Sequence, residues 1–176
     1  MKEHIRVSVI PVVSVDMYSL EPESRGYDQA NQQYNRLSSA FEEIKAVANA
    51  VFERIEESSY LLSFDFHETP DDTLTGFAMF ENIPEGWTGD ILGELAINSL
   101  KDLGYSIHGE DWDTPGRIYS KTPQCFDGFS AGLGAYSFTF ETPGSNFHSR
   151  LSMEERVRMD LIAMDTIISA YFSDKL

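Results

Sequence analysis

Apolar positions along the chain follow two patterns. Short continuous runs of apolar, β-branched and aromatic residues predict β-strands. Residues 5–14, IRVSVIPVVS, are almost continuously apolar and β-branched, which is typical of a strand buried on both faces. Short apolar and aromatic runs predict further strands at residues 60–66, 75–80 and 135–140. The strand at 60–66 ends just before His67.

The second pattern, with apolar residues three or four positions apart, predicts helices. The first covers about 35–57, with an inward face of Leu37, Phe41, Ile44, Ala48, Val51, Phe52 and Ile55. The second covers 87–103, with an inward face of Ile91, Leu92, Leu95, Ala96 and Leu100. Ser152 and Glu155 have the spacing of a capping box ahead of a last helix, which extends to about residue 172. Its predicted inward stripe is Val157, Leu161, Met164, Ile168 and Tyr171.

The order of these elements predicts the fold class. Strands that alternate with helices form βαβ units, so we expect an α/β protein with a mainly parallel mixed sheet sandwiched between helices. The 176 residues, 41% of them hydrophobic, suffice for a single domain over residues 1–176. Two stretches stay irregular in this interpretation, a polar loop at 15–34 and a glycine-rich region at 108–133.

Composition restricts the classes of partner. The formal net charge of −16 opposes electrostatic binding to nucleic acid or to an anionic membrane. Cys125 is the only cysteine, so neither an intrachain disulfide nor a site with several cysteine ligands is available. No signal peptide and no apolar run of membrane-spanning length is evident, so we expect a cytoplasmic protein.

Two similar phrases, 63-SFDFHETPD-71 and 137-SFTFETPGS-145, each run an aromatic strand into an ionisable side chain. Strand alternation directs Asp65 and His67 to one face, and a histidine beside carboxylates at a strand end is a candidate metal ligand. Glu141 lies in a partly apolar setting, which favours a raised pKa and a role as general base. The plain alternatives are a surface histidine in an acidic turn and a solvated glutamate, and these residues alone leave both open.

Other candidates carry weaker signals. Tyr119 lies in the irregular, glycine-rich stretch, where loops often cover active sites, although a loop tyrosine more often only packs. For Cys125 we expect a packing role. The remaining histidines, His4, His108 and His148, are scattered and are expected to be structural or exposed.

Taken together, these motifs resemble the zinc metallocarboxypeptidases of the carboxypeptidase A type. The run 136-YSFTFE-141 is similar to that family's catalytic strand, and Tyr119 precedes Glu141 by the 22 positions that separate the family's loop tyrosine from its catalytic glutamate. The phrase 64-FDFHE-68 is similar to the strand that carries the third zinc ligand. Upstream, 10-IPVVSVDMY-18 and 25-RGYDQANQQY-34 resemble the family's Asn-Pro-Asp-Gly turn and its substrate-binding stretch, so the resemblance covers nearly the whole chain in the correct order.

The resemblance implies a zinc cofactor and a set of roles. His67 would be a zinc ligand, and Glu141 would be the base that activates zinc-bound water. Arg25 would polarise the scissile carbonyl. In this family pattern the substrate-binding residues would be Asn31, Gln32 and Tyr119, of which Asn31 holds the substrate carboxylate and Tyr119 closes over the bound substrate.

The chain departs from the family in two places. Gln32 stands where the family has an arginine that clamps a terminal carboxylate, and a neutral amide cannot make that bidentate ionic contact. The family's first two zinc ligands form a His-x-x-Glu motif, and this sequence contains none. The chain would then be a fragment, one piece of a split chain that needs an amino-terminal segment or partner chain, or a degenerate member.

Three functions follow as hypotheses. The first is a zinc-dependent hydrolase that cleaves a peptide or related amide next to a terminal residue. The second is a non-catalytic binding module that keeps the fold and the substrate crevice. The third is an amidohydrolase similar to aspartoacylase, which would act on acylated amino acids.

Overall fold

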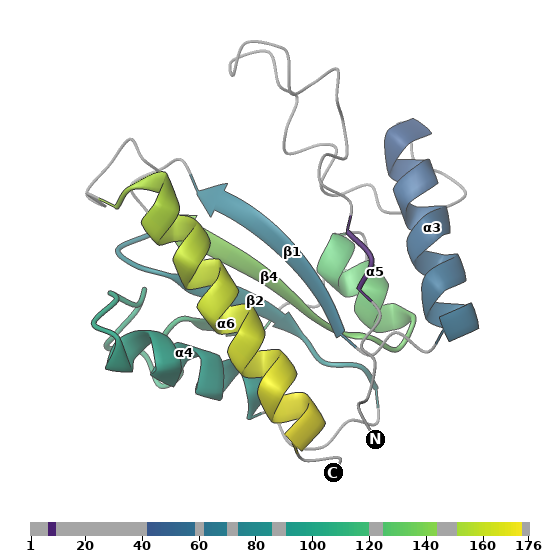
Figure 1. Ribbon diagram of the computed structural model, residues 1–176. Coiled ribbons are helices and arrows are strands. Elements are labelled where there is room, and N and C mark those ends of the chain that lie inside the picture. Colours follow the sequence, from purple (N-terminus) through teal and green to yellow (C-terminus); the bar gives the residue numbers. More distant parts are fainter. Residues whose placement is uncertain are drawn as a thin grey trace.

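The computed structural model describes residues 7–9, 42–58, 62–69, 74–85, 91–119, 125–143 and 151–173 (Figure 1). The helices are α3 (Glu42–Ser58), α4 (Leu92–Asp102), α5 (Phe126–Gly132) and α6 (Met153–Ser173). The strands are β1 (Leu62–Thr69), β2 (Ala78–Asn82), β3 (Arg117–Tyr119) and β4 (Tyr136–Pro143). Helices and strands alternate along most of the described chain, as the apolar spacing predicts.

The strands form one mixed sheet in the order β1-β4-β2-β3. β1 pairs with β4 in parallel, β2 pairs with β3 in parallel, and β2 and β4 are antiparallel. Two of these three pairings are parallel and helices flank the sheet, so the predicted α/β class with a mainly parallel mixed sheet is confirmed. The carboxyl ends of β1 and β4 therefore lie at the same edge of the sheet, whereas β2 and β3 run the other way.

The two faces of the sheet differ in chemistry because β4 alternates aromatic and polar side chains. Tyr136, Phe138 and Phe140 are fully buried and pack with Met159 and Ile167 of α6. The opposite face carries the polar residues of β1 and β4, and α5 packs there (Figure 1). α3 in turn packs on α5 through a small cluster around Ala48. This arrangement gives the sheet one apolar face and one polar face.

Two predictions from the sequence, one strand and one irregular region, are wrong in the described residues. Of the expected buried strand at 5–14, residues 7–9 are described; they belong to no strand, and Val7 and Val9 are 71% and 75% exposed. An apolar run predicts a buried strand only where the rest of the fold covers it, and these residues are exposed. The region 108–133, expected to be irregular, contains β3 and α5, which are too short to give a clear period.

The last helix is confirmed, but its predicted stripe is displaced. Glu155 accepts hydrogen bonds from the Ser152 amide and hydroxyl at 2.7 and 2.8 Å, and the Glu155 amide donates to the Ser152 hydroxyl at 3.2 Å, which completes the capping box. Val157 and Leu161 are about half exposed. The buried positions of α6 are Arg156, Met159, Ala163, Ile167 and Tyr171, so only Tyr171 belongs to both stripes. Apolar residues occur around most of this helix, so their spacing alone does not single out the face that packs on the core.

No helix in the described part of the chain combines the length and the apolarity needed to cross a bilayer.

Candidate active site

The pairing of β1 with β4 brings His67 and Glu141 side by side. They are direct partners in the parallel register, so their side chains leave the same face of the sheet. Nδ1 of His67 lies 4.0 Å from Oε1 of Glu141, and the two side chains are 17% and 16% exposed. The hydroxyl of Thr142 donates to the backbone carbonyl of His67 at 3.1 Å and ties the two strands together here. The predicted meeting of these two strand ends therefore occurs.

Asp65 occupies the other side of the imidazole. It lies two residues before His67 on β1 and so shares its face, and its Oδ2 is 2.9 Å from Nε2 of His67. This distance is that of a hydrogen bond, whereas the 4.0 Å gap from Nδ1 to Glu141 is too long for one. The imidazole therefore stands between two carboxylates, bonded to one and facing the other.

Opposing effects set the pKa of His67. Burial lowers it, but the hydrogen bond to Asp65 and the negative charges of Asp65, Glu141 and Asp127 outweigh burial and raise the pKa from 6.5 to about 9. In the metal-free protein His67 is consequently protonated at neutral pH. The positive charge of His67 is thus surrounded by three carboxylates that stabilise it.

Asp127 belongs to α5, which packs on the polar face of the sheet, and its charge acts on His67. Its side chain is buried and accepts hydrogen bonds from Nδ2 of Asn82 at 2.6 Å and from the Gly128 amide at 2.8 Å. Burial raises the pKa of Asp127 despite these hydrogen bonds, and the charge of Asp65 adds to the increase. Asp127 thus adds negative potential near His67 without lying in direct contact with it.

Cys125 precedes α5 directly. Burial raises the pKa of its thiol, and the charges of Asp127 and Asp65 raise it further. A thiol in such surroundings stays protonated and is a poor nucleophile or metal ligand. This environment agrees with the packing role expected from the sequence.

Tyr119 does not lie with His67 and Glu141, and its expected position in a loop is wrong. It ends β3, where it pairs with Glu81, which in turn pairs with Phe138 of β4. From strand spacing and rise, its Cα is roughly 14 Å from that of Glu141. The register also places Tyr119 on the apolar face of the sheet, beneath the Arg117 guanidinium at 5.5 Å, whereas Glu141 is on the polar face. The interval of 22 positions along the chain predicts neither the direction nor the face of this short strand.

The remaining predicted site residues, Arg25, Asn31 and Gln32, lie outside the described residues, as do His4 and His148. His108 is described and has a structural environment: its Nδ1 accepts from the Thr75 amide at 3.3 Å, and its ring packs edge-on against Trp112. Asp65 and Asp127 were missed as site residues. The Asp-x-His spacing within a strand was the available signal for Asp65, but Asp127 reaches the site only through the tertiary fold.

The donors present fit part of a zinc site. With Nε2 bonded to Asp65, Nδ1 of His67 is the nitrogen that can act as a ligand, and the nearby carboxylate of Glu141 suits a general base. A catalytic zinc site uses about three protein ligands. Within the described ranges no group of three histidine, cysteine, aspartate or glutamate side chains has a geometry that could hold a metal ion. Further ligands would have to come from residues outside those ranges or from another chain.

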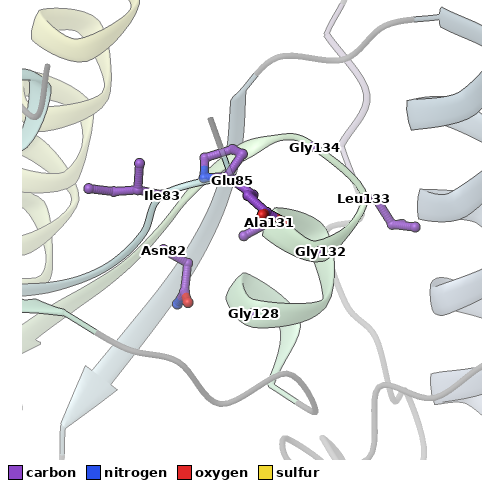
Figure 2. A pocket seen from close by; sticks show the side chains of 9 residues that line it. Asn82, Ile83, Glu85, Gly128, Ala131, Gly132, Leu133 and Gly134 are labelled. Atoms are coloured by element: carbon purple, nitrogen blue, oxygen red, sulfur yellow. The ribbon is translucent and has the colours of Figure 1, made fainter. Parts of the chain in front are cut away.

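A separate hollow lies at the opposite edge of the sheet, where β2 ends beside the last turn of α5 (Figure 2). It has a volume of about 440 Å³ and is lined by Asn82, Ile83, Pro84, Glu85, Gly128 and residues 131–134. Backbone and glycine form much of its wall, and neither His67 nor Glu141 reaches it. The hollow therefore contributes nothing to the candidate active site.

Comparison with known proteins gives a fold but no family. No protein-family model matches the chain, and no curated protein matches its sequence. A solved structure named a "putative metallopeptidase", from Shewanella amazonensis SB2B, matches with a TM-score of 0.56 at 19% identity, over 76% of this chain and 48% of that one. A protein of the same name from Shewanella denitrificans OS217 matches with a TM-score of 0.55 at 17% identity, over 80% and 51%.

A third similar structure is the cell shape determinant Csd4 of Helicobacter pylori, solved with a bound tripeptide. Its TM-score is 0.53 at 11% identity, over 80% of this chain and 37% of Csd4. The chain thus spans about half the length of the two Shewanella proteins and less of Csd4. The α/β fold described above is similar to the matching parts of these three structures.

Proposed function

We propose that this chain is part of a zinc-dependent hydrolase similar to metallocarboxypeptidases, which cleaves a peptide or amide bond near a terminal residue. The observation that carries the proposal is the pairing of His67 with Glu141 across β1 and β4, with 4.0 Å between Nδ1 and Oε1. A candidate ligand and a candidate base are adjacent at the carboxyl ends of parallel strands, where ligands bind in α/β sheets. The fold shared with metallopeptidase-like structures supports the same interpretation.

In this mechanism His67 and Glu141 have separate tasks. His67 would hold the metal through Nδ1, and bound zinc would supply a lowered pKa for water and a polarised substrate carbonyl. Glu141 accepts the proton of the attacking water on its carboxylate and passes it to the leaving nitrogen. Its low exposure keeps competing water away from that carboxylate.

Other residues would contact the substrate. Arg25 would polarise the scissile carbonyl, and Asn31 and Gln32 would contact the end of the substrate. Gln32 favours a substrate other than an ordinary free carboxy-terminal residue, because an amide cannot replace the ionic clamp of an arginine. The tripeptide bound to Csd4 supports a peptide as the class of substrate.

A non-catalytic binding module is the second candidate, and one observation favours it. The described residues supply His67 as a single histidine ligand and no group of three donors. A site without a complete metal centre could hold a peptide without cleaving it. The amidohydrolase similar to aspartoacylase is a variant of the first proposal and differs from it in the substrate only.

Hydrolysis by the purified, zinc-loaded 176-residue chain tests the proposal. The probes are N-acylated dipeptides, tripeptides and an N-acylated amino acid, and the readout is the released amine. Glu141→Gln should lower kcat by at least about 100-fold because it removes the general base. Glu154→Gln, an exposed carboxamide substitution on α6, is the matched control and should leave kcat unchanged.

Metal content separates the two candidates. Elemental analysis should find stoichiometric zinc in the wild-type chain and a loss of zinc in His67→Ala. Hydrolysis that survives Glu141→Gln would overturn the assignment of the base, and zinc that survives His67→Ala would overturn that of the ligand. Peptide binding without any hydrolysis by the zinc-loaded chain would establish the binding module instead.

A further inference from the structure

One side of α6 carries a line of apolar residues that the core does not bury. Met153, Val157 and Leu161 follow one another at intervals of about one helical turn, and they are 71%, 50% and 51% exposed. Met164 and Ile168 continue the line and are half-buried. We call these five residues the outer stripe of α6. From Val157 onward their intervals of four, three and four positions are those of the apolar seam of a coiled coil.

The core uses a different side of the same helix. Met159, Ala163 and Ile167 are fully buried in the cluster that packs on the sheet. α4 also packs on α6, where the Thr166 hydroxyl donates to that of Ser99 at 3.2 Å. Figure 1 shows α6 along the outside of the sheet. A helix with a second apolar side, left exposed in the described part of the chain, is typical of an interaction surface.

The spacing of the outer stripe is self-complementary. In an antiparallel pair of α6 helices, Val157 of one copy lies opposite Ile168 of the other, and Leu161 lies opposite Met164. Both pairs share a midpoint between residues 162 and 163, so a single two-fold axis at that point aligns all four side chains. The 21 residues of α6 extend over roughly 30 Å, which is long enough for such a pairing.

Charges beside the outer stripe fit the same arrangement. Arg158 and Asp165 are exposed and lie on one side of the stripe, two turns apart. Neither takes part in an ion pair among the described residues. Their midpoint is within one position of that of the apolar pairs, so Arg158 of each copy lies beside Asp165 of the other. The two-fold axis therefore creates two ion pairs of opposite charge.

We propose that the outer stripe of α6 binds a second copy of this chain, with the two helices antiparallel and Arg158 of each copy paired with Asp165 of the other. A second copy fits better than an unrelated partner, because this one surface supplies both members of every apolar and ionic pair. An interface of one helix from each copy is small, so the association should be reversible. The inference does not depend on the proposed function, since neither His67 nor Glu141 belongs to this surface.

Sedimentation velocity measures the association at about 150 mM NaCl, where a screening distance of roughly 8 Å limits the repulsion between two acidic copies. The wild-type chain should change from monomer to dimer as its concentration rises through about 1–100 µM. Leu161→Glu brings a charge into the centre of the interface and should weaken the dimer at least about 100-fold. Leu103→Glu, the same change at an exposed leucine after α4, is the matched control and should leave the dimer intact.

A reversal of charge tests the register. Arg158→Asp replaces two attractive pairs by two repulsive ones and should weaken the dimer about 10-fold. The double variant Arg158→Asp/Asp165→Arg has the net charge of the wild type and should regain most of its affinity. Arg54→Asp changes the net charge as Arg158→Asp does, but at an exposed position on α3, and should have a much smaller effect.

Each result supports or overturns part of the proposal. A wild-type chain that stays monomeric over this range would overturn it, even if another protein binds the stripe. A dimer that persists in Leu161→Glu would place the interface on a different surface. Failure of the double variant to recover would refute the antiparallel register. If circular dichroism shows that Leu161→Glu does not fold, the comparison of Arg158→Asp with the double variant decides the question.

Discussion

Two partly buried ionisable side chains, His67 and Asp160, show how burial and neighbouring charge compete at the scale of the residue. His67 is surrounded by negative charge, which outweighs burial and favours its charged form. For Asp160 on α6 the balance is reversed: burial dominates, the positive charge of Arg156 offsets it only partly, and the charge of Glu141 adds to it, so the pKa rises from 3.8 to about 7. Its Oδ1 is buried and makes no hydrogen bond to the described residues. A charged Asp160 is therefore a cost to the fold, whereas a charged His67 is not.

Asp160→Asn should stabilise the protein more in alkaline than in acidic solution. The folded pKa lies above the unfolded value, so the folded state holds a proton that the unfolded chain releases between about pH 4 and pH 7, and stability falls as the pH rises through this window. The substitution should raise the free energy of unfolding by about 1–3 kcal/mol at pH 8 and by roughly half as much at pH 5.5. Urea denaturation at both values measures this, with exposed Asp165→Asn as control. An equal change at both pH values would contradict the explanation.

At the scale of the element, sequence patterns predicted which strands pair and where helices lie better than they predicted which face of an element is buried. Alternation and the order of elements were enough to place His67 and Glu141 at one edge, because parallel neighbouring strands must end together. They failed for Tyr119, because a three-residue strand has no pattern that reveals its direction or its face. They also failed for α6, where Val157 and Leu161 fit a stripe as well as the buried residues do. Asp127 could not be found at all, since its position near the site depends on how α5 packs on the sheet.

Two glycine-to-alanine substitutions in helices should have opposite effects on stability. Gly93, the second residue of α4, lies against the carboxylate of Glu81, which accepts from Arg117 at 2.7 Å and from the Tyr136 hydroxyl at 3.1 Å. A Cβ on Gly93 would overlap that carboxylate, so Gly93→Ala should cost about 2 kcal/mol or more by disrupting a buried network. A Cβ on Gly132 in α5 would meet open space, and Gly132→Ala should be neutral or stabilise by up to about 1 kcal/mol. Thermal and urea unfolding compare the two, and equal effects would contradict this role of Glu81.

The whole molecule combines a small mixed sheet with a large excess of negative charge. The formal net charge is −16. Among the described residues, Glu81 is buried and bonded to Arg117, whereas many other acidic side chains are exposed to solvent. The carboxylates of Glu110, Asp111 and Asp113 are exposed and lie together on one short loop. Mutual repulsion of this kind opposes the compact state and is screened by salt, whereas a buried ion pair is screened far less.

Stability should therefore increase with ionic strength. Raising NaCl from about 20 to about 500 mM shortens the screening distance from roughly 20 Å to roughly 4 Å, which removes most repulsion between exposed carboxylates. The urea midpoint should rise while the slope of the transition stays constant, because the surface exposed on unfolding does not change. The double variant Glu110→Gln/Asp111→Asn should be more stable at low salt and should gain less from added NaCl. A control with the same number of substitutions, Asn98→Gln/Ser99→Thr, leaves the charge unaltered and should keep the full salt response. If salt lowered the urea midpoint of the wild-type chain, attractive ion pairs and not repulsion would dominate the surface.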